Sequence, residues 1–491
     1  MLQENKMSKK VLLISVALII AVCTLALCVG CESYKNDANL SMGDSTAPVS
    51  SNGGTVVKQG NYIYFVNGFA GYKTTLGKDN WFGNVLKGAI LRIKADATDM
   101  STAEVVVPKS VLSDSKNAGF SIFGDYIYYV SPSAEEDKSG KVQTDTIQFL
   151  RTKLNGQDTQ LLYQITDKDV TYKYTPNALV VLTDGKLYSK SYDAKSFKKD
   201  KPGTLIAEDV TSVEFPVNGD FDVKVGETAN DYFFYTKAEE GNEVYSNKVF
   251  ICNGTGSVNK EIINRNTYTD KPDDIANVDK VFSITLSASH VDASGITLYY
   301  SKSFYHGSSA TVAGYYGYKF TKTEADNGKI DPAKEHKFAL SAPTSVFAMG
   351  LEKGYVDYAS GIKYVKLNAD GEGEVAFEVS GDSVKVTEIY SLDDNGNLLF
   401  TNDKKLLVSK NINGGDNLNI IVDKELALDN YLICPEILDG QIYFFLSSDN
   451  YLYRVNPSEY NRVDGPMTPS LFGKMTQADL DALKEIEEEN K

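Results

Sequence analysis

The fold is decided by the stretch Asn61-Tyr62-Ile63-Tyr64-Phe65-Val66, which is followed by Ala89-Ile90-Leu91-Arg92-Ile93-Lys94. The same two runs return as Asp125-Tyr126-Ile127-Tyr128-Tyr129-Val130 and Phe149-Leu150-Arg151-Thr152-Lys153. About eight such units follow residue 54, each with an apolar run, a polar loop, a second run and a Gly or Asn turn. A repeat of this length predicts a β-propeller, because each unit is one small sheet that buries its faces against its neighbours.

Working outward from this stretch, we assign four strands, a to d, to every unit. The central b strands are nearly continuously apolar, as expected for strands covered on both faces. They are predicted at residues 62–66, 126–130, 178–182, 232–235, 296–300, 354–358, 397–400 and 441–445. The c strands alternate more, as in Leu91 and Ile93 against Arg92 and Lys94, which is typical of a half-buried strand. The predicted fold class is therefore all-β, a propeller of about eight four-stranded blades, with seven as the alternative count.

Four segments are predicted along the chain. Residues 1–30 form a lipoprotein signal peptide, and residues 31–54, rich in Ser, Asn, Asp and Gly, form a flexible tether. Residues 55–473 form the propeller. Residues 474–491 form a short acidic C-terminal helix, because Thr476 begins a capping-box pattern and apolar residues then recur at helical spacing.

The N-terminus has the pattern of a secretion signal. Lys9 and Lys10 precede an uncharged run that ends before Cys28-Val29-Gly30-Cys31. Small residues before a cysteine resemble a bacterial lipoprotein cleavage box, in which Cys31 would become the lipidated first residue. An uncleaved N-terminal membrane helix is the alternative. In both cases we expect most of the chain to lie outside the cytoplasm, tethered to the cell membrane.

Charge and cysteine content narrow the class of protein further. The net charge is −16, which argues against nucleic acid as a partner, because binding to a phosphate backbone requires clustered Lys and Arg. Three of the five cysteines lie in the predicted signal or directly after it. The other two, Cys252 and Cys434, are about four units apart, so we expect buried free thiols rather than a disulfide. No metal-ligand spacing is present, and we predict no metal and no cofactor.

The repeat pattern resembles a known family. It reads Gly-Asn/Asp-x-Ile-Tyr-Phe/Tyr, then Leu-x-Arg-x-x-x-Asp/Asn-Gly, at residues 60–65 with 91–96, 124–129 with 150–156 and 440–445 with 451–456. This pattern is similar to that of bacterial lipoproteins with low-density-lipoprotein-receptor-like propeller repeats, a domain of unknown function. The resemblance implies a propeller that serves as a binding scaffold.

The candidate binding residues lie in insertions between strands b and c. Such insertions are predicted at residues 67–88, 131–145, 236–247 and 301–313, all on one face of a propeller. Two of them are rich in aromatic residues, which suit the stacking of sugar rings or a protein hot spot. The predicted ligand-binding residues are Tyr72, Trp81, Phe82, Tyr305, His306 and Tyr315. The alternative is that these aromatic residues pack the loops themselves.

Catalytic patterns are weak, because the three histidines are isolated and no nucleophile motif is present. Inner-strand carboxylates, namely Glu214, Glu388 and Glu436, could line the axial channel and supply an acid–base pair, but we expect them to be a solvated or hydrogen-bonded lining of the channel. The stretch 393–397 has some features of a calcium loop but lacks the Gly at position six and the distal Glu. We therefore expect a lipid-anchored binding module for a glycan or an envelope protein. A glycan-active hydrolase or lyase that uses the channel carboxylates is the alternative, and enzyme activity stays undecided.

Overall fold

A computed structural model describes the packed part of the chain. It covers residues 39–68, 81–82, 85–86, 88–97, 102–108, 119–132, 146–166, 170–193, 197–218, 231–239, 242–263, 281–292, 295–306, 309–338, 345–351, 353–368, 373–413, 418–427, 435–448 and 452–456. All of these residues belong to one compact unit, Asp37–Lys491. The predicted signal peptide, Cys31, Tyr72, Cys434 and the predicted C-terminal helix lie outside the described residues.

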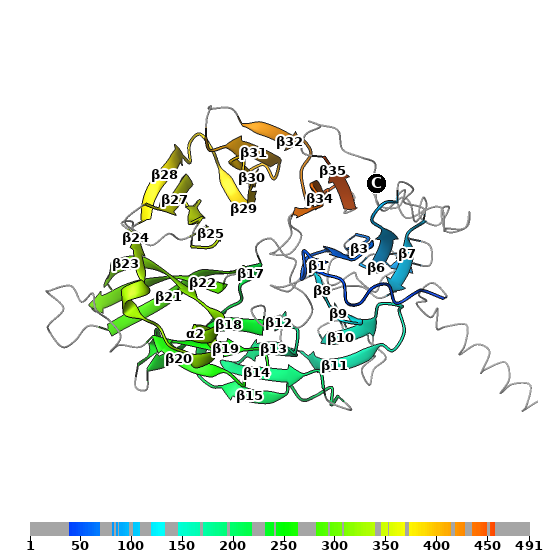
Figure 1. The fold of residues 1–491 in the computed structure, drawn as a ribbon, viewed down its shortest axis with the longest axis horizontal. Coiled ribbons are helices and arrows are strands. Elements are labelled where there is room, and N and C mark those ends of the chain that lie inside the picture. Colours follow the sequence, from blue (N-terminus) through cyan, green and yellow to red (C-terminus); the bar gives the residue numbers. More distant parts are fainter. Residues whose placement is uncertain are drawn as a thin grey trace, which may run out of the picture. The chain divides into compact units, whose positions relative to one another are not determined.

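Consecutive strands pair into small antiparallel sheets, which we call blades 1 to 8 (Figure 1). Blade 1 comprises β2 (Val56–Gln59), β3 (Tyr62–Val66), β6 (Ile90–Lys94) and β7 (Glu104–Val107), and blade 2 comprises β8 (Phe120–Phe123), β9 (Tyr126–Pro132), β10 (Ile147–Lys153) and β11 (Gln160–Ile165). Blade 3 comprises β12 (Thr171–Tyr174), β13 (Ala178–Thr183), β14 (Lys186–Ser191) and β15 (Thr204–Ala207). Blade 4 comprises β16 (Val210–Glu214), β18 (Tyr232–Glu239), β19 (Asn242–Asn253) and β20 (Asn259–Ile263).

Blades 5 to 8 continue the same meander. Blade 5 comprises β21 (Val281–Asp292), β22 (Gly295–His306), β23 (Ser309–Phe320) and β24 (His336–Phe338), and blade 6 comprises β25 (Val346–Ala348), β26 (Tyr355–Asp357), β27 (Gly361–Leu367) and β28 (Gly373–Ser380). Blade 7 comprises β29 (Val386–Leu392), β30 (Asn397–Asn402), β31 (Leu407–Asn411) and β32 (Asn419–Val422). Blade 8 comprises β33 (Glu436–Leu438), β34 (Gln441–Phe445) and β35 (Leu452–Val455). Short additions are β1 (Val49–Ser50), β4 (Trp81–Phe82), β5 (Val85–Leu86), β17 (Val217–Asn218), helix α2 (Lys322–Asn327) and a 3₁₀ turn (Pro332–Lys334).

The sheets form a β-propeller. The first strands of neighbouring blades touch, as β2 does with β8 and β16 with β21, and β2 also packs against β33 of the last blade. Every predicted central strand is the second strand of its blade, which confirms the assignment of strand b. Over the described residues the count is eight blades, and blades 5 and 6 join through one parallel bridge, Phe338 to Gly373.

The apolar core lies between the blades. The Phe149 ring of β10 meets the Tyr172 ring of β12 edge to face, with centroids 4.9 Å apart. The rings of Phe234 and Phe320 join blades 4 and 5, tilted to each other with centroids 5.6 Å apart. Because each blade buries both faces against its neighbours, the tyrosine-rich runs serve mainly as core.

The second half of the predicted tether is packed, which corrects that prediction for residues 39–54. Leu40 and Val49 belong to the core of blade 1, and β1 pairs with β2. Arg92 fixes this segment: its side chain is 1% exposed and donates to the Ser41 carbonyl at 2.7 Å, the Leu154 carbonyl at 3.2 Å and Glu104 at 2.8 Å. Arg92 is therefore buried, although the alternation of its strand predicts an exposed side chain.

Two of the predicted b–c loops are strands instead. In blade 5, β22 and β23 are both 12 residues long and pair out to His306 and Ser309. β21 runs alongside β22 as far as Val281. In blade 4, β18 and β19 pair out to Glu239 and Asn242. The insertions there lengthen the strands of blades 4 and 5, because their backbone N–H and C=O groups pair across the hairpin.

Candidate binding site

The carboxylates predicted to line the channel each hydrogen-bond a residue of a neighbouring blade. Glu214 of β16 accepts from the Ser289 hydroxyl of β21 at 3.1 Å. Glu388 of β29 accepts from the Tyr358 hydroxyl at 3.1 Å. Both carboxylates therefore hold neighbouring blades together, which is a structural role.

Glu436 makes the most extensive of these contacts, at the seam between the first and last blades. Its carboxylate accepts from the Thr55 backbone N–H, from the Thr55 hydroxyl at 2.5 Å and from the Val56 backbone N–H at 3.2 Å. Burial raises the pKa of Glu436 to about 7, and the hydrogen bonds from Thr55 and Val56 act in the opposite direction. The Glu436 side chain therefore links the last blade to the first through hydrogen bonds.

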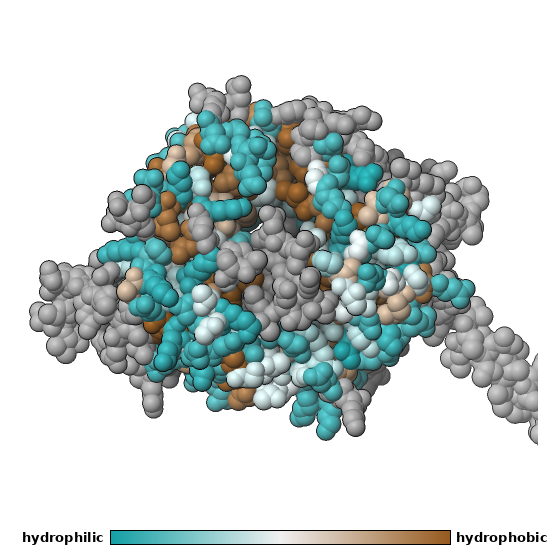
Figure 2. All heavy atoms as spheres, viewed as in Figure 1, coloured by the Kyte–Doolittle hydropathy of each residue, from teal (hydrophilic) through white to brown (hydrophobic). Residues whose placement is uncertain are grey.

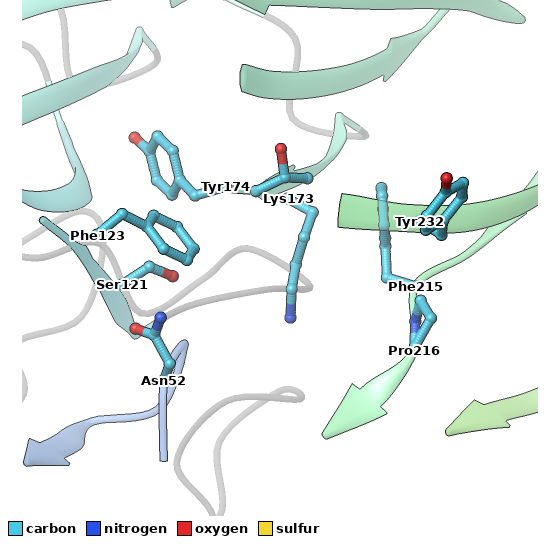
Figure 3. A pocket seen from close by; sticks show the side chains of 9 residues that line it. Asn52, Ser121, Phe123, Lys173, Tyr174, Phe215, Pro216 and Tyr232 are labelled. Carbon is cyan, nitrogen blue, oxygen red and sulfur yellow. The ribbon is translucent and has the colours of Figure 1, made fainter. Parts of the chain in front are cut away.

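A cavity lies between the inner strands of blades 2, 3 and 4. Its enclosed volume is about 30 Å³, and the space widens to about 430 Å³ when the adjoining open solvent is included. Its lining comprises Asn52, Ser121, Phe123, Lys173, Tyr174, Thr175, Phe215, Pro216 and Tyr232. Figure 3 shows the Lys173 side chain extending into the gap between the groups from blade 2 and those from blade 4.

Lys173 is the only cationic side chain in this lining. No residue in the described part of the chain forms a hydrogen bond or ion pair with its ammonium. Burial lowers its pKa, and the charge of Glu214 acts in the opposite direction. Burial also raises the pKa of Glu214 to about 7, with the hydrogen bonds from Ser289 lowering it. The cavity thus combines an ammonium and a hydroxyl with aromatic rings, which is chemistry suited to binding, whereas the Asn52 amide already bonds the Ile122 backbone.

The predicted aromatic residues fall in different places. Trp81 and Phe82 form β4, which pairs with β5 in the insertion of blade 1. Tyr305 and His306 end β22, on the extended hairpin of blade 5. The structure does not group these positions with Tyr315.

Tyr315 is part of the core, which corrects its assignment as a ligand contact. It is fully buried, and its ring meets those of Tyr355 at 5.0 Å and Phe338 at 5.7 Å. The side chain falls inside because β23 starts at Ser309, so that Tyr315 lies well within a paired strand. It joins blade 5 to blade 6.

The remaining predicted features fit local structure. Cys252 is a buried free thiol. In the loop 393–397, Asp393 accepts from the backbone N–H groups of Asn395 at 2.9 Å and Asn397 at 2.7 Å, which makes it an ordinary turn between β29 and β30. Among the described residues, no group of three or more His, Cys, Asp or Glu side chains could hold a metal ion.

Lys173, Ser121 and Asn52 were not among the predicted site residues. Lys173 interrupts the apolar residues of the first strand of blade 3, between Tyr172 and Tyr174, and this signal could have marked it. Asn52 and Ser121 carry no such signal, because one lies in the predicted tether and the other in an ordinary inner strand. Their approach depends on the packing of residues 39–54 against blade 2.

The exterior fits the acidic composition. Hydrophilic residues cover most of the described surface on the face shown in Figure 2, with hydrophobic ones visible between them. No helix among the described residues has the length and apolar character needed to cross a membrane.

Comparisons with known proteins give distant structural likenesses. No family model and no curated protein sequence matches the chain. AztD from Citrobacter koseri shares 10% sequence identity, with a TM-score of 0.37, over 77% of this chain and 91% of that chain. BamB from Moraxella catarrhalis shares 9%, with a TM-score of 0.35, over 86% and 98%. Sqt1 from Saccharomyces cerevisiae shares 9%, with a TM-score of 0.35, over 69% and 82%. At these TM-scores the likenesses carry no argument, and the propeller architecture rests on the sheet topology and blade contacts.

Proposed function

We propose that the chain is an extracytoplasmic β-propeller lipoprotein, anchored in the cell membrane through lipidated Cys31, that acts as a binding module for a glycan or an envelope protein. The signal pattern ending at Gly30-Cys31 supports the anchor and the location. The likeness of the repeats to those of low-density-lipoprotein-receptor-like bacterial lipoproteins supports a binding scaffold.

One observation favours a binding module over a glycan-active enzyme. The three carboxylates that an acid–base mechanism would use hydrogen-bond across neighbouring blades: Glu214 to Ser289, Glu388 to Tyr358 and Glu436 to Thr55. A glycosidase needs one carboxylate for the leaving group and a second for water or the sugar carbon. Groups that hold the blade seams are poorly available for either task. The cavity between blades 2, 3 and 4 presents an ammonium and aromatic rings instead.

The anchor is tested by expressing the full chain and its Cys31→Ser variant in a bacterium. The wild-type chain should fractionate with membranes and take up labelled palmitate, and the variant should do neither. Ser is a close steric match, so a folding difference does not explain a change. Incorporation of label into the variant would refute lipidation at Cys31.

The ligand is tested by applying the full chain, solubilised in detergent, to a glycan array. Binding should be lost in the double variant Trp81→Ala with Tyr305→Ala if the insertions of blades 1 and 5 carry the ligand. Tyr358→Phe, which removes only the hydroxyl bonded to Glu388, is the matched aromatic control and should bind normally. Hydrolysis of a bound glycan by the wild-type chain would establish the enzyme instead.

A further inference from the structure

The cavity between blades 2, 3 and 4 brings two hydrogen-bond donors to one point. A Cβ atom at Gly53 would lie 3.6 Å from Lys173 Nζ and 3.8 Å from Ser121 Oγ, so both groups face the same space beside the Gly53 backbone. Neither group has a hydrogen-bond partner within the described part of the chain. Gly53 itself has φ of +96°, which a residue with a side chain would adopt only under strain.

The size of the cavity matches a small anionic group. A cavity needs about 10–15 Å³, measured for the centres of water-sized spheres, to hold one water molecule. The space of about 30 Å³ therefore holds roughly two oxygen-sized groups, the number in a carboxylate. A whole sugar ring would have to lie in the adjoining open space.

The charges in the lining also favour an anion. Lys173 is only partly exposed, so its ammonium is less well solvated than in open water, and a ligand carboxylate would give it a charge-assisted hydrogen bond. The facing carboxylate, Glu214, already accepts from the Ser289 hydroxyl. Glu214 acts on Lys173 only through its charge and forms no hydrogen bond or ion pair with it among the described residues, so a ligand can supply the direct acceptor that Lys173 lacks.

The remaining lining distinguishes a sugar acid from a peptide end. Peptide C-termini are captured by unpaired backbone N–H groups. The nearest ones here already donate, Gly53 N–H to the Phe120 carbonyl at 3.0 Å and Gly54 N–H to the Ser51 carbonyl at 3.1 Å. The other lining groups include the rings of Phe123, Tyr174 and Phe215 (Figure 3). Aromatic rings suit the apolar faces of sugars.

From this geometry we infer that the cavity binds the carboxylate of a uronic acid unit in an acidic glycan. Lys173 donates to the carboxylate, Ser121 donates a second hydrogen bond, and the sugar ring extends toward the aromatic lining. The inference rests on the proposed function as a binding module and narrows its ligand to a class of sugar.

The test uses the full chain in detergent and three probes: trigalacturonic acid, its methyl ester and a neutral galactose trisaccharide. Calorimetry should show binding of the acid at least ten times tighter than of the ester or the neutral sugar. Lys173→Met should weaken binding of the acid at least tenfold. Lys58→Met is the matched control and should change nothing, because Lys58 also lies on an inner strand but pairs with Asp439 at 2.5 Å.

If Lys173→Met fails to fold, the wild-type chain still decides. Trigalacturonic acid should protect Lys173, but not Lys58, from acylation by an activated ester, as read by mass spectrometry. Equal protection of both lysines, or none of Lys173, would overturn the assignment.

The other outcomes separate the inference from the proposed function. Equal binding of the acid and its methyl ester, unaffected by Lys173→Met, would reject the carboxylate site and leave a glycan-binding module. Binding of a peptide with a free C-terminus but not of its amide, together with no binding of any sugar, would reject the sugar acid in favour of a peptide end. If none of these probes binds, the inference is rejected, and the proposed function as a binding module loses the support that this cavity gives it.

Discussion

Glu436 and Thr55 lie 381 residues apart in the chain, yet the Glu436 carboxylate accepts hydrogen bonds from both the backbone N–H and the hydroxyl of Thr55. The contact joins the first strand of the last blade to the chain that enters the first blade. The β2 strand packs against β33 at the same place. Among the described residues, no strand pairing joins the first and last blades, so side-chain contacts such as this one help to hold the ring closed.

Replacing Glu436 should weaken the closure of the ring. Glu436→Ala leaves the buried N–H groups of Thr55 and Val56 without their acceptor, at about 1–3 kcal/mol for each unsatisfied group. We expect the free energy of unfolding, measured by urea titration of the solubilised chain, to fall by about 3 kcal/mol. Glu425→Ala is the control, because Glu425 forms an exposed pair with Lys405 at 3.6 Å and should change stability by less than about 1 kcal/mol. Equal effects of the two variants would contradict the role of Glu436.

The stability of the protein should fall as the pH rises toward neutrality. Burial raises the pKa of Glu436 and of Glu214 to about 7, whereas both carboxyls titrate near 4.5 when exposed. Between these values the folded chain holds protons that the unfolded chain has released. The free energy of unfolding therefore falls across this window, by about 3 kcal/mol for one fully buried carboxyl and by less for Glu214, which is partly exposed.

Urea midpoints at about pH 5 and about pH 8 measure this effect. The double variant Glu214→Gln with Glu436→Gln should lose most of the pH dependence, because neither amide titrates. Identical slopes for the variant and the wild-type chain would show that other groups carry the pH dependence.

Replacing Arg92 should release the N-terminal segment from blade 1. Arg92→Met removes the donor to the Ser41 and Leu154 carbonyls and the cation stacked 4.5 Å from the Tyr62 ring centroid. We expect a loss of about 3 kcal/mol in the free energy of unfolding and faster proteolysis within residues 39–50.

Arg151→Met is the control for this prediction. Arg151 lies at the corresponding place in blade 2, 4.4 Å from the Tyr126 ring centroid, and donates to Gln160 at 2.9 Å. Among the described residues, no contact joins Arg151 to the N-terminal segment, so its loss should cost about 1 kcal/mol and leave proteolysis of residues 39–50 unchanged. Faster cleavage in both variants would mean that general destabilisation, and not the Arg92 contacts, exposes the segment.

Truncating Tyr315 should destabilise the propeller. Tyr315→Ala removes a ring buried among Tyr299, Phe338 and Tyr355, and the change should cost about 3–5 kcal/mol, as for other large aromatic side chains in cores. Tyr315→Phe keeps the ring and should cost less than about 1.5 kcal/mol. Thermal unfolding of the two variants checks this. A Tyr315→Ala protein of wild-type stability that had lost its ligand would restore Tyr315 to the binding site.

Much of the scaffold could be predicted from the sequence. The central strands were placed correctly because their apolar, tyrosine-rich runs repeat, and a strand covered on both faces shows that pattern locally. The tether was predicted wrongly for residues 39–54, because a polar segment carries little sign of the neighbour against which it will pack. The b–c loops of blades 4 and 5 were predicted wrongly because polar residues can equally extend a two-stranded ladder.

The sequence by itself determined the repeat, the strand order and the class of fold, since these depend on patterns within a few tens of residues. Only the tertiary structure decided which side chains meet. It set Glu436 against Thr55, buried Arg92 and Tyr315, and brought Lys173, Ser121 and Gly53 to one cavity. These meetings depend on how blades separated along the chain pack side by side in a closed ring, and no local pattern encodes that arrangement.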